Sequence, residues 1–100
     1  MIDFKNILNK YIERTGFAIE DIAGKSQDRR VSEKRHLLWL ILRSSSPLVR
    51  YKDIVEFMGS IGHKTTVSNV QQNVKKMEMK IQVKGFRPYA KVVESVLDEI

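Results

Sequence analysis

The stretch RHLLWLILR, residues Arg35–Arg43, decides the fold of this 100-residue chain. Its six central residues, Leu37–Leu42, are all apolar, so a helix formed from them is expected to be buried on most sides. Ser32 is a suitable N-cap before it. The Ser44–Pro47 stretch ends it, because serines compete for backbone hydrogen bonds and proline lacks an amide proton. The sequence therefore predicts a central helix over 32–43.

Apolar residues at helical spacing predict further helices on both sides of this central one. The expected helices cover residues 3–14, 18–23, 32–43, 50–58, 64–80 and 88–99. Asp3 is the expected N-cap of the first helix and Gly16 its expected end. The polar, basic stretch 25–31 has no periodicity and is expected to be an exposed loop. The predicted fold is all-α, with five to six helices in a single domain over residues 1–100.

The charge of the chain points to an anionic partner. Lysine and arginine number 18 against 12 acidic residues, which gives a net charge of +6. Residues 24–36 hold five basic and two acidic side chains, and residues 62–84 hold five basic side chains and one acidic. These two blocks contain more than the whole excess. Clustered positive charge is typical of nucleic-acid binding, so double-stranded DNA is the partner we expect first.

The segment 50–80 has the pattern of a helix-turn-helix. A short helix over 50–58 is followed by a turn and then by a second helix, which buries Val67, Val70 and Val74. The opposite face of that second helix carries hydroxyl, amide and lysine side chains. Such groups bind base edges and phosphates, since asparagine and glutamine pair two-fold with adenine.

Four motifs within residues 7–77 resemble the C-terminal DNA-binding domain of DnaA, the bacterial replication initiator. Asp21–Arg30 is similar to that family's basic loop, and Arg35–Arg43 to its central helix. Tyr51–Gly59 resembles its LPEIG-x-x-FGG motif, and Lys64–Val67 resembles the end of its RDHTTV signature. The likeness implies a Trp-repressor-like helix-turn-helix fold, extended here by the extra helix 88–99.

The resemblance also implies roles for particular residues. In that family an Asp-His-Thr triplet opens the recognition helix and contacts bases, and here the triplet reads His63, Lys64, Thr65. Only the threonine is kept, so the family's base preference does not carry over. The family's basic loop sends an arginine into the minor groove, a role that falls to Arg29 or Lys25. Together with the exposed-face residues, the expected DNA contacts are Lys25, Arg29, Arg30, His63, Lys64, Thr65, Thr66, Ser68, Asn69 and Gln72.

Catalysis is not expected. No phosphate-binding GxxxxGK[ST] loop, thiolate or metal-ligand spacing occurs, so we expect neither a catalytic residue, a metal nor a cofactor. The longest apolar run has six residues where a membrane span needs about 20. We therefore expect no membrane contact and a cytoplasmic, nucleoid-associated protein.

A second hypothesis is a protein–protein interaction module or dimerising accessory domain without specific DNA recognition. It rests on the wide apolar stripe of the last helix, formed by Val92, Val93, Val96, Leu97 and Ile100. That stripe either folds back on the core, which we favour, or forms a homodimer seam or a surface for a protein partner.

Overall fold

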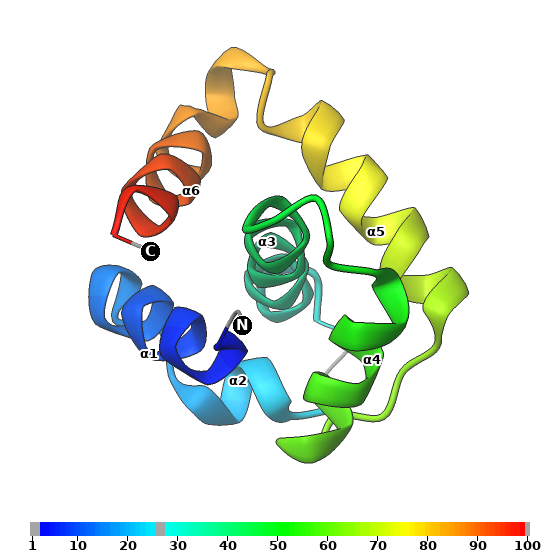
Figure 1. Ribbon diagram of the computed structural model, residues 1–100. Coiled ribbons are helices and arrows are strands. Elements are labelled where there is room, and N and C mark those ends of the chain that lie inside the picture. The colour runs from blue at the N-terminus through cyan, green and yellow to red at the C-terminus, as the bar shows by residue number, and fades with distance from the viewer. Residues whose placement is uncertain (1–2, 26–27, 100) are drawn as a thin grey trace.

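The apolar segment 37–42 lies in the middle of α3, Arg29–Ser44, and the other helices surround it (Figure 1). The computed structural model describes residues 3–25 and 28–99. Within them all regular structure is helical, which confirms the all-α prediction. The elements are α1 Phe4–Thr15, α2 Ile19–Ala23, α3, α4 Tyr51–Ser60, α5 Val67–Lys80, the 3-10 turn η1 Lys84–Phe86 and α6 Arg87–Asp98.

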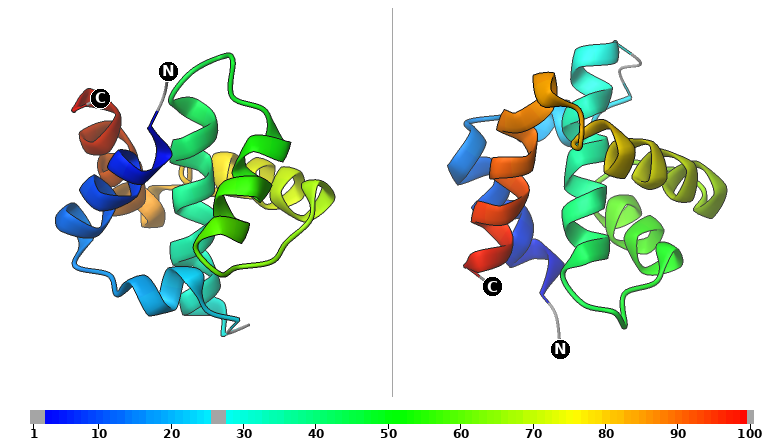
Figure 2. Two further views of the ribbon diagram at one scale, coloured as in Figure 1. Left: turned by 60° about the horizontal axis from the view of Figure 1, so that its bottom comes forward. Right: turned by 90° about the horizontal axis from the view of Figure 1, so that it is seen from above.

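The central helix is the most buried element, as predicted. Every residue from Leu37 to Leu42 is buried, and Trp39 is completely inaccessible. α3 packs against α1, α2, α4, α5 and α6, so its apolar stretch needs no exposed side (Figure 2). Each leucine withdrawn from water in this way contributes about 1.5–3 kcal/mol to the free energy of unfolding. The core is therefore organised around one helix.

The first helix begins and ends where the sequence predicts. The Asp3 carboxylate accepts hydrogen bonds from the backbone N–H of Lys5 and of Asn6, at 3.0 and 3.3 Å. At the other end Gly16 has a φ of +73°, a left-handed conformation that glycine adopts without steric cost. These two residues define α1.

The start of the central helix corrects the sequence analysis. Asp28 is the N-cap, since its carboxylate accepts a hydrogen bond from the backbone N–H of Arg30 at 2.9 Å. The expected cap, Ser32, lies inside the helix. Arg29 and Arg30 therefore belong to the first turn of α3, not to a loop as predicted. Of the expected loop, Ser26 and Gln27 lie outside the described residues.

The last helix folds back on the core, as favoured from its sequence. α6 packs against α1 and α3, with Val93 and Val96 buried. Glu99 at its C-terminal end forms ion pairs with Arg14 and Lys10 of α1. The apolar stripe is thus covered within the chain as far as it is described. Ile100, also assigned to the stripe, lies outside the described residues.

Candidate nucleic-acid interface

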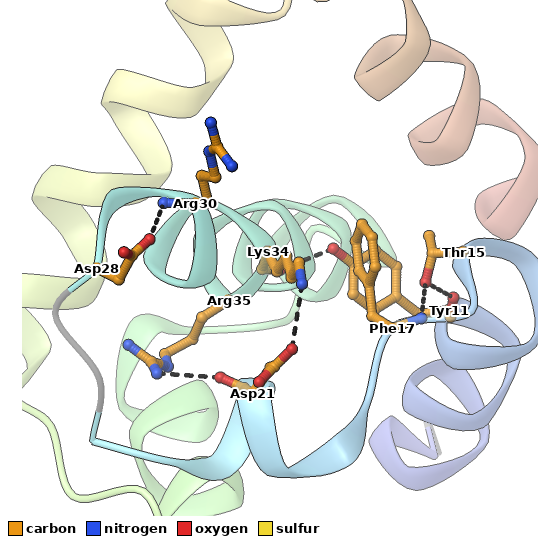
Figure 3. A network of polar contacts seen from close by, with 8 residues as sticks. All are labelled: Tyr11, Thr15, Phe17, Asp21, Asp28, Arg30, Lys34 and Arg35. Atoms are coloured by element: carbon orange, nitrogen blue, oxygen red, sulfur yellow. Dashed lines mark hydrogen bonds and ion pairs between the residues drawn. The ribbon is translucent and has the colours of Figure 1, made fainter.

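Arg35, a buried arginine of α3, binds the C-terminal end of α2, just before the basic segment that starts at Lys25. Arg35 donates from Nε to the carbonyl oxygen of Ile22 at 2.9 Å, and from a terminal nitrogen to the carbonyl of Gly24 at 2.8 Å. A further bond to the Asp21 carbonyl, drawn in Figure 3, measures 3.2 Å. Its burial lowers the pKa of Arg35. The guanidinium of Arg35 therefore holds the backbone just before Lys25 against α3.

The same junction has a second set of contacts on its outer side. Lys34 Nζ lies 3.1 Å from a carboxylate oxygen of Asp21 and 4.9 Å from the ring centre of Phe17. The hydroxyl of Tyr11 donates to the Lys34 carbonyl at 2.7 Å. Figure 3 shows these residues together, with the Arg30 side chain extending away from them. Arg30 is exposed.

The two helices predicted for the helix-turn-helix are α4 and α5, which are joined by the connection 61–66 and pack together. α4 continues past Gly59, the expected end, to Ser60. The turn comes later, where Gly62 has a φ of +97° and the His63 N–H donates to the Met58 carbonyl at 2.8 Å. The left-handed residue, not the first glycine, sets the end of the helix.

The second helix of the pair starts three residues later than predicted. Thr66 is its N-cap, because the Thr66 hydroxyl accepts a hydrogen bond from the Asn69 backbone N–H at 3.1 Å. Consequently His63, Lys64 and Thr65 precede α5 and do not form its first turn. Val67, expected in the core, is 43% exposed.

Three strips can be distinguished on the surface of α5, apart from the flank that carries Val67, Gln71 and Glu78. Val70, Val74 and Met77 face the core and are buried. Ser68 and Gln72 are exposed and lie opposite them on the helix. The third strip is the flank that faces α3. Its four members, spaced for one side of a helix, are Asn69, Asn73, Lys76 and Lys80.

The uncharged polar side chains of α5 hydrogen-bond to one another along the helix. Asn69 Nδ2 donates to the Thr65 hydroxyl at 2.9 Å, and Asn73 Nδ2 donates to Asn69 Oδ1 at 2.9 Å. On the outer strip Gln72 Nε2 donates to the Ser68 hydroxyl at 3.3 Å. Each amide has two donor hydrogens and two acceptor lone pairs, so every one keeps capacity for an external partner.

A groove of about 390 Å³ lies between the first half of α3 and the start of α5. It brings together residues that are far apart in the sequence. Its lining consists of Lys25, Ser32, Arg35, His36, Trp39, His63, Lys64, Thr65, Asn69 and Asn73. Among these described residues there is no carboxylate. The local charge is therefore positive.

Both histidines of the chain line this groove and pack against Trp39. The ring centres of His36 and His63 lie 5.1 and 6.0 Å from that of Trp39. Burial, and after it the charge of Arg35, lowers the pKa of His36 to about 4. Burial also lowers the pKa of His63, although a hydrogen bond to the Gly24 carbonyl acts in the opposite sense. Both rings are thus neutral at pH 7.

The position of His63 differs from that of an exposed DNA contact. Its side chain is only 8% exposed, and Nδ1 lies 2.8 Å from the Gly24 carbonyl oxygen. Since a carbonyl can only accept, Nδ1 carries the proton. His63 therefore fastens the turn before α5 to the end of α2.

A smaller groove of about 180 Å³ continues the first one along α3 and α5. Glu33 lies in it, with its carboxylate 2.8 Å from Lys80 Nζ, 3.1 Å from the Tyr89 hydroxyl and 3.6 Å from Arg29 Nε. Burial acts to raise the pKa of Glu33, but the bonds from Lys80 and Tyr89 outweigh it and lower that pKa. At this end of the groove the negative charge of Glu33 is therefore already compensated by Lys80 and Arg29.

The structure thus separates the predicted contacts into groups. Lys25, His63, Lys64, Thr65 and Asn69 line the larger groove, and Arg29 lines the smaller one. Ser68 and Gln72 occupy the outer strip of α5 and Thr66 caps that helix, all three exposed, while Arg30 extends from the start of α3.

Sequence reasoning did not name five residues that line the larger groove: Ser32, Arg35, His36, Trp39 and Asn73. The four-residue steps from Ser32 to His36 and from Asn69 to Asn73 were the available signal. Each step places two polar residues on one helix flank.

Two further findings limit the chemistry that can be assigned to the described ranges. Residues 3–25 and 28–99 contain no group of three His, Cys, Asp or Glu side chains placed to hold a metal ion. None of the helices found there is long and apolar enough to span a bilayer.

Comparison with protein-family models, with curated proteins and with solved structures found no significant match. The likeness to the initiator domain therefore rests on the quoted motifs alone.

Proposed function

We propose that the protein binds double-stranded DNA through α4 and α5, with the outer strip of α5 in the major groove. The observation that carries the proposal is that strip itself. Ser68 and Gln72 are exposed and uncharged, and both can hydrogen-bond in two directions. Such groups are suited to base edges, which present both donors and acceptors in the major groove.

The cations support the same orientation of the helix. Exposed Lys25, Lys64 and Lys76 come from three segments and lie along the α3-facing flank of α5 and the groove beside it. A helix about 10–12 Å across fills a major groove about 12 Å wide, so its flanks meet the phosphate walls. In this proposal the lysines hold the backbone and the outer strip of α5 contacts the bases.

The competing interaction-module hypothesis loses its main support. It rested on an unpartnered stripe on the last helix, and Val93 and Val96 of that stripe are buried against the chain's own helices. We propose binding without catalysis or a cofactor, because both histidines are engaged in packing around Trp39. With DNA as the partner, the proposed location is the nucleoid.

The experiment is selection of bound duplexes from a random-sequence DNA library at two salt concentrations. We expect a preferred sequence to be enriched. The affinity for it should fall with salt with a log–log slope of about −4 to −6, corresponding to some five to seven phosphate contacts. Absence of binding at about 50 mM salt, where charge contacts are little screened, contradicts the proposal. Binding without enrichment reduces it to non-specific association.

A further inference from the structure

The two grooves described above form one channel between two helix flanks. Both include Ser32 and His36 of α3 and Asn73 of α5 in their linings. Along α3 the wall continues with Arg29 and Glu33, and along α5 with Asn69, Lys76 and Lys80. The channel thus runs parallel to the outer strip of α5 and beside it.

The two ends of the channel differ in charge. At the smaller end Glu33 is bound by Lys80, Arg29 and Tyr89, so acid and base compensate each other. At the larger end the lining includes Lys25, Arg35 and Lys64, and no carboxylate among the described residues. Arg35 is used on the carbonyls of α2, but Lys25 and Lys64 are exposed. The larger end therefore attracts an anion.

Hydrogen-bond donors at the larger end fit the same ligand. The Ser32 hydroxyl and the Asn69 amide line it, and so does the Asn73 amide, whose nitrogen already donates to Asn69. Trp39 also lines it, and its completely buried indole nitrogen has no hydrogen-bond partner among the described residues. Because this nitrogen is inaccessible, the donors that a ligand in the groove can reach are the Ser32 hydroxyl and the Asn69 amide.

From this geometry we propose that the larger end of the channel binds a phosphate group of the DNA strand that runs along the α3-facing flank of α5. Lys25 and Lys64 contribute the charge, and Ser32 and Asn69 the hydrogen bonds. The inference rests on the proposed function, because α5 in a major groove brings that flank to a phosphate wall. It changes the expected role of Asn69 from contact with a base to contact with the backbone.

The site has its own reporters, because the chain's two histidines both line it. His36 is faced by Arg35 and Glu33 from α3 and by Lys76 and Lys80 from α5. His63 is faced by Arg35 and by the backbone of Ala23 and Gly24. An anion placed among these groups favours the imidazolium form, so occupancy of the site raises both pKa values. A phosphate at the smaller end of the channel, where His36 but not His63 forms part of the lining, raises the pKa of His36 alone, and a phosphate outside the channel raises neither.

The first test follows the two histidine rings by NMR as a function of pH, in the full chain, with inorganic phosphate and with chloride at equal ionic strength. We expect phosphate to raise both pKa values. Lys64→Gln and Lys25→Gln should each weaken phosphate binding by about tenfold, the size expected for a hydrogen bond to a charged group. Lys91→Gln, an exposed position on α6 outside the channel, should change nothing. Unchanged histidine pKa values in phosphate, or equal losses in all three variants, overturn the proposal.

The second test repeats the titration with a selected duplex and with the same duplex bearing single neutral methylphosphonates. We expect the duplex to raise both histidine pKa values, and one methylphosphonate position to abolish that rise and weaken binding by about tenfold. Tight DNA binding with unchanged histidines overturns the phosphate site and leaves the proposed function standing. Raised pKa values in inorganic phosphate without any binding of duplex DNA have the opposite meaning: the site exists and the proposed function is wrong.

Discussion

α5 and α6 are amphipathic helices of similar length that pack against different sides of α3 (Figure 1). Their buried faces are alike, with valines at the centre of each. Their outer faces differ. α6 carries one Arg, one Lys, one Glu and one Asp, net zero, and the adjacent Glu99 pairs with α1. α5 carries three Lys and one Glu, net +2, with Lys64 just before it.

In both helices the buried face and the outer face meet different requirements. The buried valines of both helices meet the same need, which is to cover α3. The outer faces differ: the charges of α6 balance, whereas α5 has an excess of lysine and exposed polar side chains. A change in the shared core should therefore affect both sides, and a change in one outer face should affect that side alone.

The largest effect is expected in the core that the two sides share. Leu38→Ala removes a completely buried side chain from α3 and leaves a cavity, so the free energy of unfolding should fall by about 2–5 kcal/mol. Urea denaturation measures it, with Ser68→Ala as an exposed control expected within about 0.5 kcal/mol. A loss below about 1 kcal/mol at Leu38 contradicts the central position of α3.

Lowering the pH should destabilise the α5 side of the protein, where both histidines lie. The folded protein resists protonation of His36, whose pKa is about 4, whereas the unfolded chain takes up the proton near its ordinary value of 6.5. Stability is therefore fully present above pH 6.5 and falls as the pH drops from 6.5 towards 4, by about 3 kcal/mol. Urea denaturation across this range in phosphate-free buffer measures it. His36→Gln should remove much of this dependence of stability on pH. A pKa of His36 near 6.5, measured by NMR, contradicts the prediction.

The outer strip of α5 should determine sequence preference. Gln72→Ala should cost about 1–3 kcal/mol on a selected sequence and little on random DNA, because only base contacts depend on sequence. Lys25→Ala should weaken both by similar factors and reduce the salt slope by about one. Fluorescence anisotropy at several salt concentrations measures both variants. If the two variants behave alike on every duplex, α5 does not read bases.

The smallest effect is expected on the balanced side. Glu99→Gln breaks the ion pairs of α6 with Arg14 and Lys10, which are partly exposed, so stability should fall by less than about 1 kcal/mol. The affinity for DNA should stay the same. A clear change in DNA affinity shows that the two sides are coupled and that the division between them is wrong.

Sequence periodicity was sufficient for the helices and for most of their buried positions, because both depend on local spacing, although Val67 is exposed. The uninterrupted run 37–42 predicted the burial of α3, and Gly16 predicted the end of α1. The predicted starts of α3 and α5 were wrong because apolar spacing does not show which polar side chain caps a helix. Asp28 caps α3 in place of Ser32, and Thr66 caps α5 after the expected start at Lys64.

The candidate site was only partly predictable, because it depends on which helix flanks meet. Periodicity places Asn69 and Asn73 on one side of a helix, but not opposite Ser32 and His36. The inward position of His63 could not be predicted either, because its partner is the carbonyl of Gly24, which is distant in the sequence. Charge clustering predicted the cations. Tertiary packing decides which of them share a groove.

The most direct test of the account is backbone amide NMR of the full chain, titrated with a selected DNA duplex. We expect the largest shifts in residues 63–76, at Lys25 and in the first two turns of α3. The amides of α1 and α6 should remain unchanged. Shifts concentrated in α1 and α6, or absence of shifts at saturating duplex, contradict it.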